Sequence, residues 1–445
     1  MDWFGRAWSQ NGFTADQTTS SSPLNRQEIT MDLKQQIEEA NQVAVKRMID
    51  GDPVLVDIAP AIEVIPGMQD KMITHAGPPI SWQKMGGAQR GAIVGQVLFE
   101  GWAHTPEESV AMLDKGEIAL EPNHHHQAVG PMAGTISANS WVYVVENKAF
   151  GNRAYCRQVE GMQQFGDYSE KALEGLRSWR DVFAPALRAA LRCEGELPLK
   201  PIITQALQMG DELHNRHSGA SALFGNAMSV GLAKADISRQ DQISTLYLLK
   251  NHNLIFLGIA MAAGKAIADP SRDVEYSSMV TAMCRNGVEF GIRVSGLGDQ
   301  WFTAPAPFVD GLYVPGFSAE DAGLDMGDSA ITETVGWGGF VLGGATGILS
   351  LVGGTPEEAL AYTREMRTIT IATHPVYKMP IFGFEGTPTG IDIRKVIQTN
   401  STPIIDTAIA HKEPGFPKLG GGLVRAPYDC FKKALVAFGQ KYSAK

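Results

Sequence analysis

Apolar and polar positions follow different periods along the chain, and the change of period divides the sequence into three blocks. The first block, residues 30–163, opens with a helical apolar stripe over 32–50. Shorter segments then predict strands over 53–61, 71–80 and 134–147 and a helix over 87–101. Strands and helices that alternate in this way are typical of a mixed α/β domain.

The second block, residues 164–272, has the helical period throughout, with charged residues opposite the apolar positions. We therefore expect a helical middle domain that contains essentially no strand. The third block, residues 273–440, returns to strands and helices with many glycines. The predicted fold class is α/β (mixed α+β), with two mixed α/β domains and a helical middle domain.

Two segments bear on localisation. Residues 1–29 are polar and lack the apolar central run of a signal peptide, so we interpret them as a disordered or loosely attached leader. Residues 334–356 carry no charge but include eight glycines. Each glycine costs ~1 kcal/mol relative to alanine inside a helix. This segment predicts a buried glycine-rich turn and helix rather than a membrane span, and we expect a cytoplasmic protein without a membrane partner.

Charge and cysteine content exclude several classes of function. The 445 residues include 38 Lys and Arg against 48 Asp and Glu, which gives a net charge of −10. An acidic chain without basic blocks is a poor candidate for binding nucleic acid or an anionic membrane. The four cysteines are far apart and form no C-x-x-C motif. We therefore expect buried thiols, no structural zinc and no cofactor.

Histidines form two candidate clusters. His124 to His126 are consecutive, and adjacent side chains on a strand point to opposite faces. They favour a polar turn at a strand entrance over a metal site shared with His75. Asp211, His214 and His217 are spaced i, i+3, i+6, which places them roughly on one face of a helix. They form either a metal or proton-transfer site or a polar stripe that faces another domain.

A third candidate contains Arg285 and Arg293, eight residues apart. Arginine suits forked recognition of carboxylate or phosphate. Gly296 and Gly298 flank a turn whose N–H groups can face an anion. The segment has neither a Walker sequence nor a G-x-G-x-x-G motif, so the motif alone favours a β-hairpin with a tight turn.

A fourth candidate gathers five polar residues within nine positions: Asp325, Asp328, Ser329, Thr332 and Glu333. Asp328 or Ser329 is expected to cap a helix that runs through Ile331. Helix starts bind anions, so the cap and a ligand site can coincide. An Asp-x-x-Asp pair can also hold Mg²⁺, but nothing in this segment requires it.

Eight motifs occur in the order found in the YlbE-like family and cover about residues 31–440: THAGPPISW, HHHQAVGPMAGTIS, VVEN, GNRAYC, RNGVEFGIRVSGLGDQWFTAP, DMGDSAITET, GIDIRKV and IAHKEPG…VRAP. The chain resembles this family, which includes the AllG component of oxamate carbamoyltransferase in allantoin catabolism. The resemblance implies carbamoyl transfer between carbamoyl phosphate and oxamate or a similar small amide or amine acid. It also implies an FdrA-like and an AllH-like partner subunit, and we further expect a homo-oligomer.

Such chemistry needs cations and helix starts for two anionic substrates, and donors for the charge that develops on the carbamoyl oxygen. With the resemblance, the expected substrate-binding residues are Arg285, Arg293, Ser329, Asp325, His75, His214, Gly296, Gly298 and Arg425. The expected catalytic residues are His411, Lys412, Glu413 and Asp328. No metal ligand is assigned.

The segment 407–427 supplies most of this chemistry. His411 is the expected proton carrier, Lys412 meets phosphate or carboxylate, and Glu413 orients either of them. Gly420 to Gly422 are expected to let backbone approach a small ligand. Asp406 stands where the family pattern has Asn, and Pro414, Pro417, His126 and His217 also depart from the pattern, which leaves the substrate's identity open.

We expect His411 and Lys412 to converge with Asp328, Ser329 and Arg293 in one cleft. Two functions remain open for such a chain. One is a carbamoyltransferase or its catalytic subunit. The other is a non-catalytic scaffold or metabolite-binding subunit of a complex whose chemistry lies in a partner.

Overall fold

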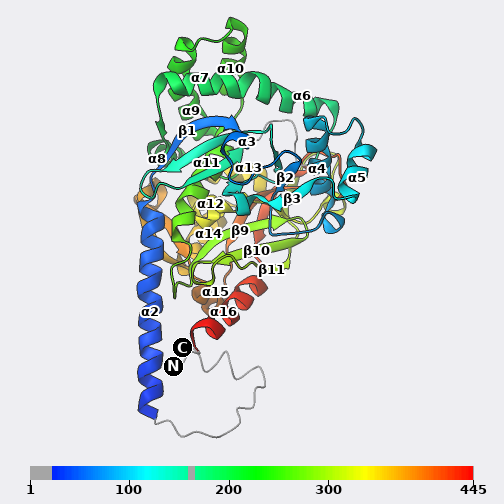
Figure 1. Ribbon diagram of the computed structural model, residues 1–445. Coiled ribbons are helices and arrows are strands. Elements are labelled where there is room, and N and C mark those ends of the chain that lie inside the picture. Colours follow the sequence, from blue (N-terminus) through cyan, green and yellow to red (C-terminus); the bar gives the residue numbers. More distant parts are fainter. Residues whose placement is uncertain (1–22, 159–165, 444–445) are drawn as a thin grey trace.

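The computed structural model describes residues 23–158 and 166–443, and it begins with the long helix α2 (Pro23–Asp50) at one side of the molecule (Figure 1). The helix expected over 32–50 is confirmed as part of α2. Of the expected leader, residues 23–29 belong to this helix and residues 1–22 lie outside the described residues.

The first block, together with β8 of the second block, builds two sheets. The larger has the order β4-β7-β6-β1-β8, and the smaller has the order β3-β2-β5. Their strands are β1 (Pro53–Pro60), β2 (Met72–His75), β3 (Ala119–Pro122), β4 (Ala128–Val129), β5 (Ile136–Ser137), β6 (Trp141–Asn147), β7 (Arg153–Arg157) and β8 (Leu197–Pro198). The helices are α3 (Ala61–Val64), α4 (Gly87–Glu100) and α5 (Pro106–Asp114), with the 3-10 turns η1 (Trp82–Lys84) and η2 (Asn123–His126). The strands predicted over 53–61 and 71–80 and the helix predicted over 87–101 are confirmed in position as β1, β2 and α4. The single strand predicted over 134–147 is wrong in part, because this segment forms two strands, β5 and β6, that belong to different sheets.

The second block is helical, and in its described part, residues 166–272, the two-residue β8 is the only strand. The helices are α6 (Glu170–Ser178), η3 (Trp179–Phe183), α7 (Ala184–Glu194), α8 (Leu199–Gln208), α9 (Ser218–Lys234), α10 (Arg239–Asn251), α11 (Ile255–Ala268) and η4 (Asp269–Ser271). The prediction of a block with essentially no strand therefore agrees with the structure. Figure 1 shows α7 and α10 at one end of the molecule and α11 inside it.

The third block forms three antiparallel sheets, ordered β11-β10-β9-β13, β12-β17-β16 and β14-β15. The strands are β9 (Val280–Asn286), β10 (Glu289–Val294), β11 (Phe302–Pro305), β12 (Asp310–Tyr313), β13 (Met326–Gly327), β14 (Thr370–Met379), β15 (Glu385–Ile391), β16 (Ile404–Ile409) and β17 (Gly420–Arg425). The helices are α12 (Ile331–Thr334), α13 (Leu349–Val352), α14 (Pro356–Thr368), α15 (Ile393–Thr399) and α16 (Tyr428–Tyr442). Short 3-10 turns lie between them: η5 (Ser295–Leu297), η6 (Ala319–Asp321), η7 (Gly338–Gly344), η8 (Thr346–Ile348) and η9 (Pro380–Phe382).

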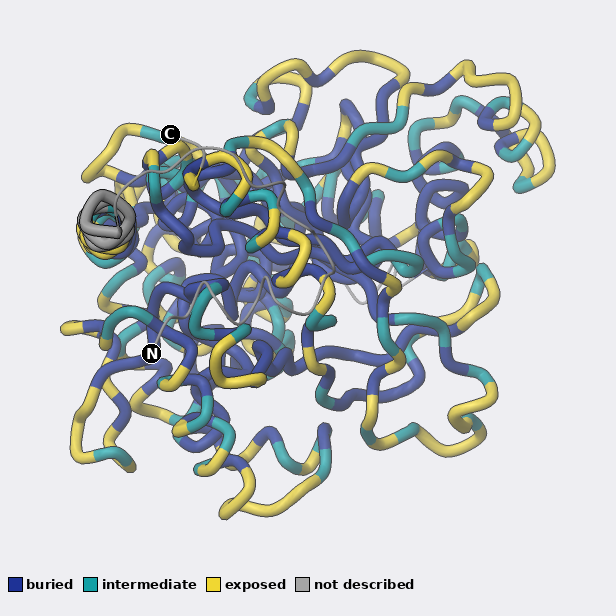
Figure 2. Tube along the Cα trace, turned by 90° about the horizontal axis from the view of Figure 1, so that it is seen from below, coloured by how far each residue is buried: buried dark blue, intermediate teal, exposed yellow. Residues whose placement is uncertain are grey.

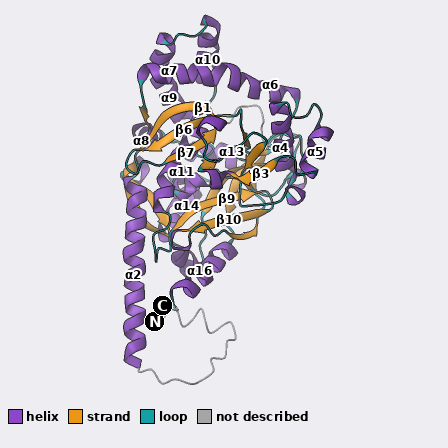
Figure 3. Cartoon of the chain, in the orientation of Figure 1, coloured by secondary structure: helices purple, strands orange, loops and turns teal. Residues whose placement is uncertain are grey.

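Helices and strands of the three blocks interleave, which confirms the mixed α/β fold class (Figure 3). Buried segments fill the centre of the molecule, and most exposed residues lie at its edge (Figure 2). The uncharged segment 334–356 forms turns and short helices, with η7 largely buried, as predicted. The division into three domains stays a prediction, because the largest core crosses all three blocks.

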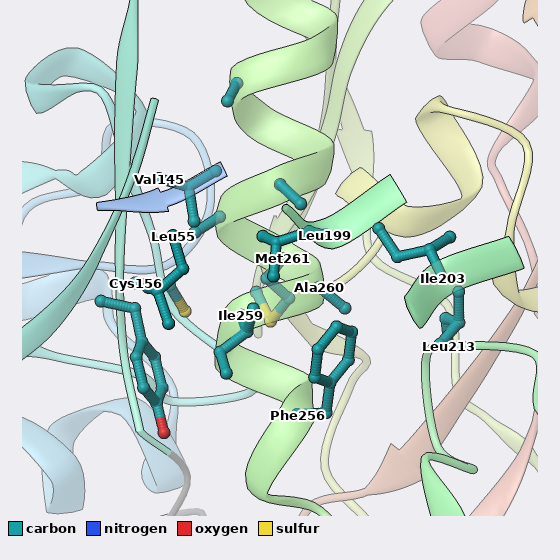
Figure 4. Packing of buried hydrophobic residues seen from close by; sticks show 14 of the residues in the cluster. Leu55, Val145, Cys156, Leu199, Ile203, Leu213, Phe256, Ile259, Ala260 and Met261 are labelled. Atoms are coloured by element: carbon teal, nitrogen blue, oxygen red, sulfur yellow. The ribbon is translucent and has the colours of Figure 1, made fainter. Parts of the chain in front are cut away.

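That core is organised around α11, in which every residue is buried. Phe256, Ile259 and Met261 of α11 pack among residues of β1, β6, β7 and α8 (Figure 4). The same cluster continues to Tyr377 and Met379 of β14. Close packing of this kind makes the central helix sensitive to loss of volume.

Among the described residues no single helix is long and apolar enough to cross a membrane. The pair α10 and α11 reaches the required length and hydropathy only when taken together, and the two are bent by 76° relative to each other.

We predict that Phe256→Ala lowers the free energy of unfolding by about 3–5 kcal/mol, because the cavity inside the main core cannot fully collapse. Thermal and urea unfolding followed by circular dichroism measure this loss. Phe150→Ala is the matched control, because Phe150 is 42% exposed, and we expect it to cost less than about 1 kcal/mol. Equal losses in the two variants would contradict the central place of α11.

Candidate active site

A pocket of about 320 Å³ lies where distant segments of the chain meet. Its walls are the first turn of α4, the loop before β13, and the segment that follows β16. The lining residues are Gly86, Gly87, Ala88, Gln89, Gly287, Phe308, Ala322, Gly323, Leu324, Met326, Ala410, His411 and Lys412. The pocket therefore joins the first and third blocks.

The start of α4 gives this pocket an anion-binding wall. The first N–H groups of a helix have no acceptor inside the helix, and together with the helix dipole they favour negative charge. Gly86, at the N-cap position, has no side chain to satisfy them, and the first turn holds no acidic residue. A carboxylate or phosphate in the pocket would meet these N–H groups.

Glycine at position 87 is a packing requirement. A Cβ atom at Gly87 would overlap the carbonyl oxygen of Lys412. The absence of a side chain thus allows the start of α4 to lie against the 411–413 segment, and the two together enclose the pocket.

His411 lines the pocket, and its ring is held by two contacts. Its side chain is buried, and its ring stacks on Phe416 with centroids 3.9 Å apart. The Nδ1 atom accepts a hydrogen bond of 2.9 Å from the backbone N–H of Glu413. A neutral imidazole that accepts at Nδ1 carries its proton at Nε2. In this state Nε2–H can donate to a bound anion.

The neighbours of His411 play different parts from those expected. Glu413 is exposed, and its backbone N–H, not its carboxylate, fixes the imidazole. Lys412 is also exposed, and its Nζ donates to the carbonyl oxygen of Glu320 at 2.6 Å. Lys412 lines the pocket, but its ammonium group is held at Glu320, which is not among the lining residues.

Gln89 connects the pocket wall to the buried carboxylate of Asp328 through one peptide unit. The Nε2 atom of Gln89 donates to the carbonyl oxygen of Ala76 at 2.8 Å, and the adjoining N–H of Gly77 donates to Asp328 Oδ1 at 2.8 Å. Hydrogen bonds on both sides of one peptide group polarise it and strengthen each other. Asp328 itself is absent from the pocket lining and lies behind this wall.

The carboxylate of Asp328 is fully buried and accepts two further hydrogen bonds, from Asn123 Nδ2 and the N–H of Gly130, each at 2.9 Å. Burial raises the pKa of Asp328 to about 6, and the hydrogen bonds counteract only part of that effect. The expectation that Asp328 or Ser329 caps a helix is wrong. Helix α12 begins after Ala330 without a side-chain cap, because the Asp328 side chain is committed to the other segments.

His75 lies beside the same peptide unit. Its Nδ1 is 2.9 Å from the carbonyl oxygen of Ala76 and 3.3 Å from Gln89 Nε2. Burial lowers the pKa of His75 to about 4, so the ring is neutral at physiological pH. His75 therefore supports the pocket wall and carries no charge for an anion.

Arg285 is bound by other residues of the protein and does not face the pocket. It is fully buried and forms a bidentate ion pair with Asp325 at 2.7 and 3.0 Å. Its remaining donors contact the carbonyl oxygen of Gly327, Ser329 Oγ and Thr407 Oγ1. All five N–H groups of the guanidinium are thus used within the protein, and none remains for a substrate.

Arg293 lies on the opposite face of the β9–β10 hairpin. Arg285 pairs with Phe290 and Arg293 pairs with Ala282 across the ladder, which places the two arginines on different faces. Arg293 covers the ring of Trp301 at 4.3 Å. The predicted hairpin is present, but a single anion site containing both arginines does not form.

In the turn 296–298, the backbone groups of Gly296 are also hydrogen-bonded within the protein. The N–H of Gly296 donates to Ser277, and its carbonyl oxygen accepts from Tyr442 and Lys441. Gly298 ends the turn with φ +64°. Its expected role as an anion-binding turn is therefore contradicted at Gly296.

Two other expectations differ from the structure. Gly420 to Gly422 form the first half of β17, the central strand of its sheet, where glycine allows close pairing with β12, and they are not part of the pocket lining. Arg425 forms a bidentate pair with Glu365 at 2.7 and 2.9 Å at the surface.

The segment 211–217 is not helical, so Asp211, His214 and His217 do not share a helix face. Leu213 has φ +70°, which interrupts a helix at this point. His214 Nδ1 contacts the buried carboxylate of Glu333 at 2.8 Å. Asp211 instead accepts from the N–H of Ala220 near the start of α9.

His214 and Glu333 belong to a cluster with Glu212 and Asp406, and all three carboxyl groups are buried. Burial raises the pKa of Asp406 to about 7 and holds the pKa of Glu212 well above its usual range. The charge of Asp406 raises the pKa of Glu212 further, and that of Glu333 raises the pKa of both groups, whereas a hydrogen bond with Glu212 lowers the pKa of Asp406. Three buried carboxylates cannot all be charged at low cost.

Several residues of the pocket escaped the sequence reasoning. Gly86 and Gly87 immediately precede an apolar helical pattern without an N-capping side chain, and this combination is a signal for a helix start open to an anion. Gln89 and Phe308 have no comparable signal, because only the tertiary fold brings them to the pocket.

Comparison with known proteins gives one consistent relationship. Residues 118–329 match the family model described as "Oxamate carbamoyltransferase subunit AllG". The chain is 44% identical to the Escherichia coli protein "Uncharacterized protein YahG", over 92% of this chain and 88% of that protein. It is 43% identical to the E. coli "Oxamate carbamoyltransferase subunit AllG", over 91% of this chain and 98% of that protein. A crystal structure of a conserved Enterococcus faecalis V583 protein of unknown function is 43% identical, with a TM-score of 0.90 over 92% of this chain and 99% of that one.

We predict that Asp406→Asn weakens the dependence of stability on pH. A carboxyl group whose pKa is raised by folding stabilises the native state in its protonated form, and this contribution is lost as the pH rises from about 4 through about 7. The variant should therefore be more stable than the native protein at pH 8, by roughly 1–3 kcal/mol and with a higher melting temperature, and the two should differ less at pH 5.

Melting temperatures measured from pH 5 to pH 8 test this expectation. Asp70→Asn, at an exposed position, is the matched control and should keep the native pH dependence. A native-like slope in Asp406→Asn would show that this carboxyl group does not carry the shifted protonation.

Proposed function

The chain belongs to the AllG family, and on this basis we propose that it is a carbamoyltransferase subunit that binds carbamoyl phosphate and oxamate, or a similar small amide or amine acid, in the pocket at the start of α4. One observation carries the proposal. The uncapped start of α4 and His411, whose Nδ1 accepts from the N–H of Glu413, line the same pocket. Both substrates are anions of a size that suits such a pocket, and neither needs a cofactor from this chain.

The proposed reaction forms a carbon–nitrogen bond. The amide nitrogen of oxamate attacks the carbamoyl carbon, the bond from that carbon to the phosphate oxygen breaks, and phosphate leaves. The proton lost by the nitrogen is taken up by the departing phosphate, so the reaction balances without an oxidant or a metal-bound base. Negative charge develops on the carbamoyl oxygen and on the leaving phosphate, and donors placed near them in advance lower the barrier.

The residues of the pocket have distinct roles in this proposal. The N–H groups of the first turn of α4 hold the phosphate, and Lys412 adds positive charge at the rim. His411 donates from Nε2 to the carbamoyl oxygen or the leaving phosphate, because its Nδ1 already accepts from Glu413. Gln89 supports this wall: its Nε2 donates to the carbonyl oxygen of Ala76, and Asp328 holds the peptide of Ala76 and Gly77 in place.

The subunit name of the E. coli relative supports a multi-protein complex. We propose FdrA-like and AllH-like proteins as partners and a cytoplasmic role in purine or allantoin catabolism, together with self-association of this chain. A non-catalytic subunit that binds a metabolite for its partners is the alternative, and it predicts binding without an effect of His411 on turnover.

We predict that His411→Gln lowers carbamoyl transfer by roughly 10²–10³-fold in the complex reconstituted from this chain and its two partners, because a glutamine amide, without the Nδ1 contact to Glu413, is not held with a donor at the developing charge. Carbamoyl phosphate consumption with oxamate measures the rate, first for this chain alone and then with the partners. His104→Gln, at an exposed histidine, is the matched control and should retain activity. Full activity of a folded His411→Gln complex would favour the non-catalytic alternative.

We predict that Gly87→Ala weakens binding of oxamate and phosphate at least tenfold, about 1.4 kcal/mol, because a Cβ atom there pushes the helix start away from Lys412. Titration calorimetry on this chain alone measures the affinities. Gly439→Ala is the control, since no atom lies within 4 Å of a Cβ at that helical position. Unchanged affinity in a folded Gly87→Ala protein would place the anion elsewhere.

A further inference from the structure

A second cluster of reactive side chains lies behind the pocket wall. His124 of η2, Cys284 of β9 and Asp328 before α12 come from distant parts of the chain, and all three are buried. One ligand atom from each residue lies within 4.8 Å of the other two. The three consecutive histidines and the scattered cysteines gave no sign of this meeting in the sequence.

We propose that His124, Cys284 and Asp328 form a binding site for a borderline transition-metal ion of the Zn²⁺ class. The site is separate from the proposed anion pocket, and it does not depend on the proposed reaction.

The spacing of the ligand atoms suits a single ion. His124 Nε2 and Asp328 Oδ1 are 3.6 Å apart. Two ligand atoms at about 2.0–2.2 Å from a tetrahedral zinc ion lie roughly 3.3–3.6 Å apart. Small side-chain movements therefore bring the three atoms into a coordination sphere, and one position remains for water or another ligand.

The environment of His124 independently indicates that a ligand binds at this cluster. Its side chain is fully buried, yet neither ring nitrogen has a hydrogen-bond partner among the residues that the structure describes. A buried polar atom without a partner costs about 1–3 kcal/mol. A metal ion between His124, Cys284 and Asp328 would remove this cost at the nitrogen that points toward the carboxylate.

Asp328 is already oriented as a ligand. Three donors, the N–H groups of Gly77 and Gly130 and Nδ2 of Asn123, hold its two oxygens in place. Such outer hydrogen bonds fix the geometry of metal ligands in known sites. The edge of Trp301 faces the ring of His124, with centroids 5.5 Å apart, and covers the cluster on that side.

The nearest cations are engaged by their own partners. Lys265 forms an ion pair with Asp269 at 2.7 Å, and Arg293 lies over Trp301 and 3.4 Å from Asp299. These contacts reduce the repulsion that a metal ion would meet.

The donor set selects the class of metal. Thiolate and imidazole favour Zn²⁺, Co²⁺ and related ions over Mg²⁺ or Ca²⁺, which prefer oxygen. Binding releases the thiol proton of Cys284 to solvent, and the thiolate and the carboxylate then balance the two charges of the ion. Metal, ligands and proton are thus accounted for without any change of oxidation state.

The test uses the full chain produced in medium supplemented with zinc or with cobalt, followed by dialysis against a weak chelator. We expect about one zinc per chain by elemental analysis, and a thiolate-to-cobalt charge-transfer band in the near ultraviolet. Absence of both in the folded native chain overturns the proposal.

Variants then assign the ligands. Cys284→Ser and His124→Gln should each weaken zinc binding by more than about 100-fold, since even outer contacts change affinity by about 10–100-fold. Cys156→Ser, at another buried thiol, and Cys193→Ser, at the exposed thiol, are the matched controls and should keep the native affinity. Circular dichroism confirms that each variant is folded. Native zinc affinity in folded Cys284→Ser or His124→Gln, or loss of the metal only in Cys193→Ser, overturns the assignment.

Discussion

The geometry around the pocket depends on one buried carboxylate, that of Asp328. Its oxygens accept three hydrogen bonds from two segments that are far from it in sequence, one at Gly77 and one that contains Asn123 and Gly130. Burying a carboxyl group is costly, and these donors offset part of that cost only when both segments are in place. The same contact orients the peptide between Ala76 and Gly77, which holds Gln89 at the start of α4. The hydrogen bonds of a carboxylate that lies outside the pocket thus hold the pocket wall in place.

The sequence predicted local structure well because local structure follows from short-range periodicity. The helices over 32–50 and 87–101 and the strand over 53–61 have clear apolar patterns, and each formed as expected. The prediction of a shared helix face in 211–217 was wrong because Gly210 and Leu213 adopt positive φ angles, which the spacing of the histidines cannot reveal. His411 was found through its chemical type and the resemblance. The tautomer of His411 could not be predicted, because it depends on the backbone N–H of the residue two positions later.

The two arginines show that residue type alone does not identify a functional site. Arg285 and Arg293 are both attractive as anion ligands, yet one is fully saturated by Asp325 and its neighbours and the other packs on Trp301. The turn at Gly287 sets the register of the hairpin, and the register puts the two side chains on opposite faces. Once that turn is located, the sequence is enough to predict that the two side chains lie on opposite faces. It is not enough to predict that every N–H group of Arg285 is hydrogen-bonded, because Asp325 and Thr407 reach it only through tertiary contacts.

The position of α11 has a consequence for synthesis on the ribosome. This helix is complete at Ala268, but the core around it also includes Tyr377 and Met379, more than 100 residues later in the chain. At about 5–20 residues per second, the interval between them is roughly 5–20 seconds of translation. During that time the most apolar helix of the nascent chain has only part of its packing partners. Chaperones that bind exposed apolar segments therefore have their longest access at this stage.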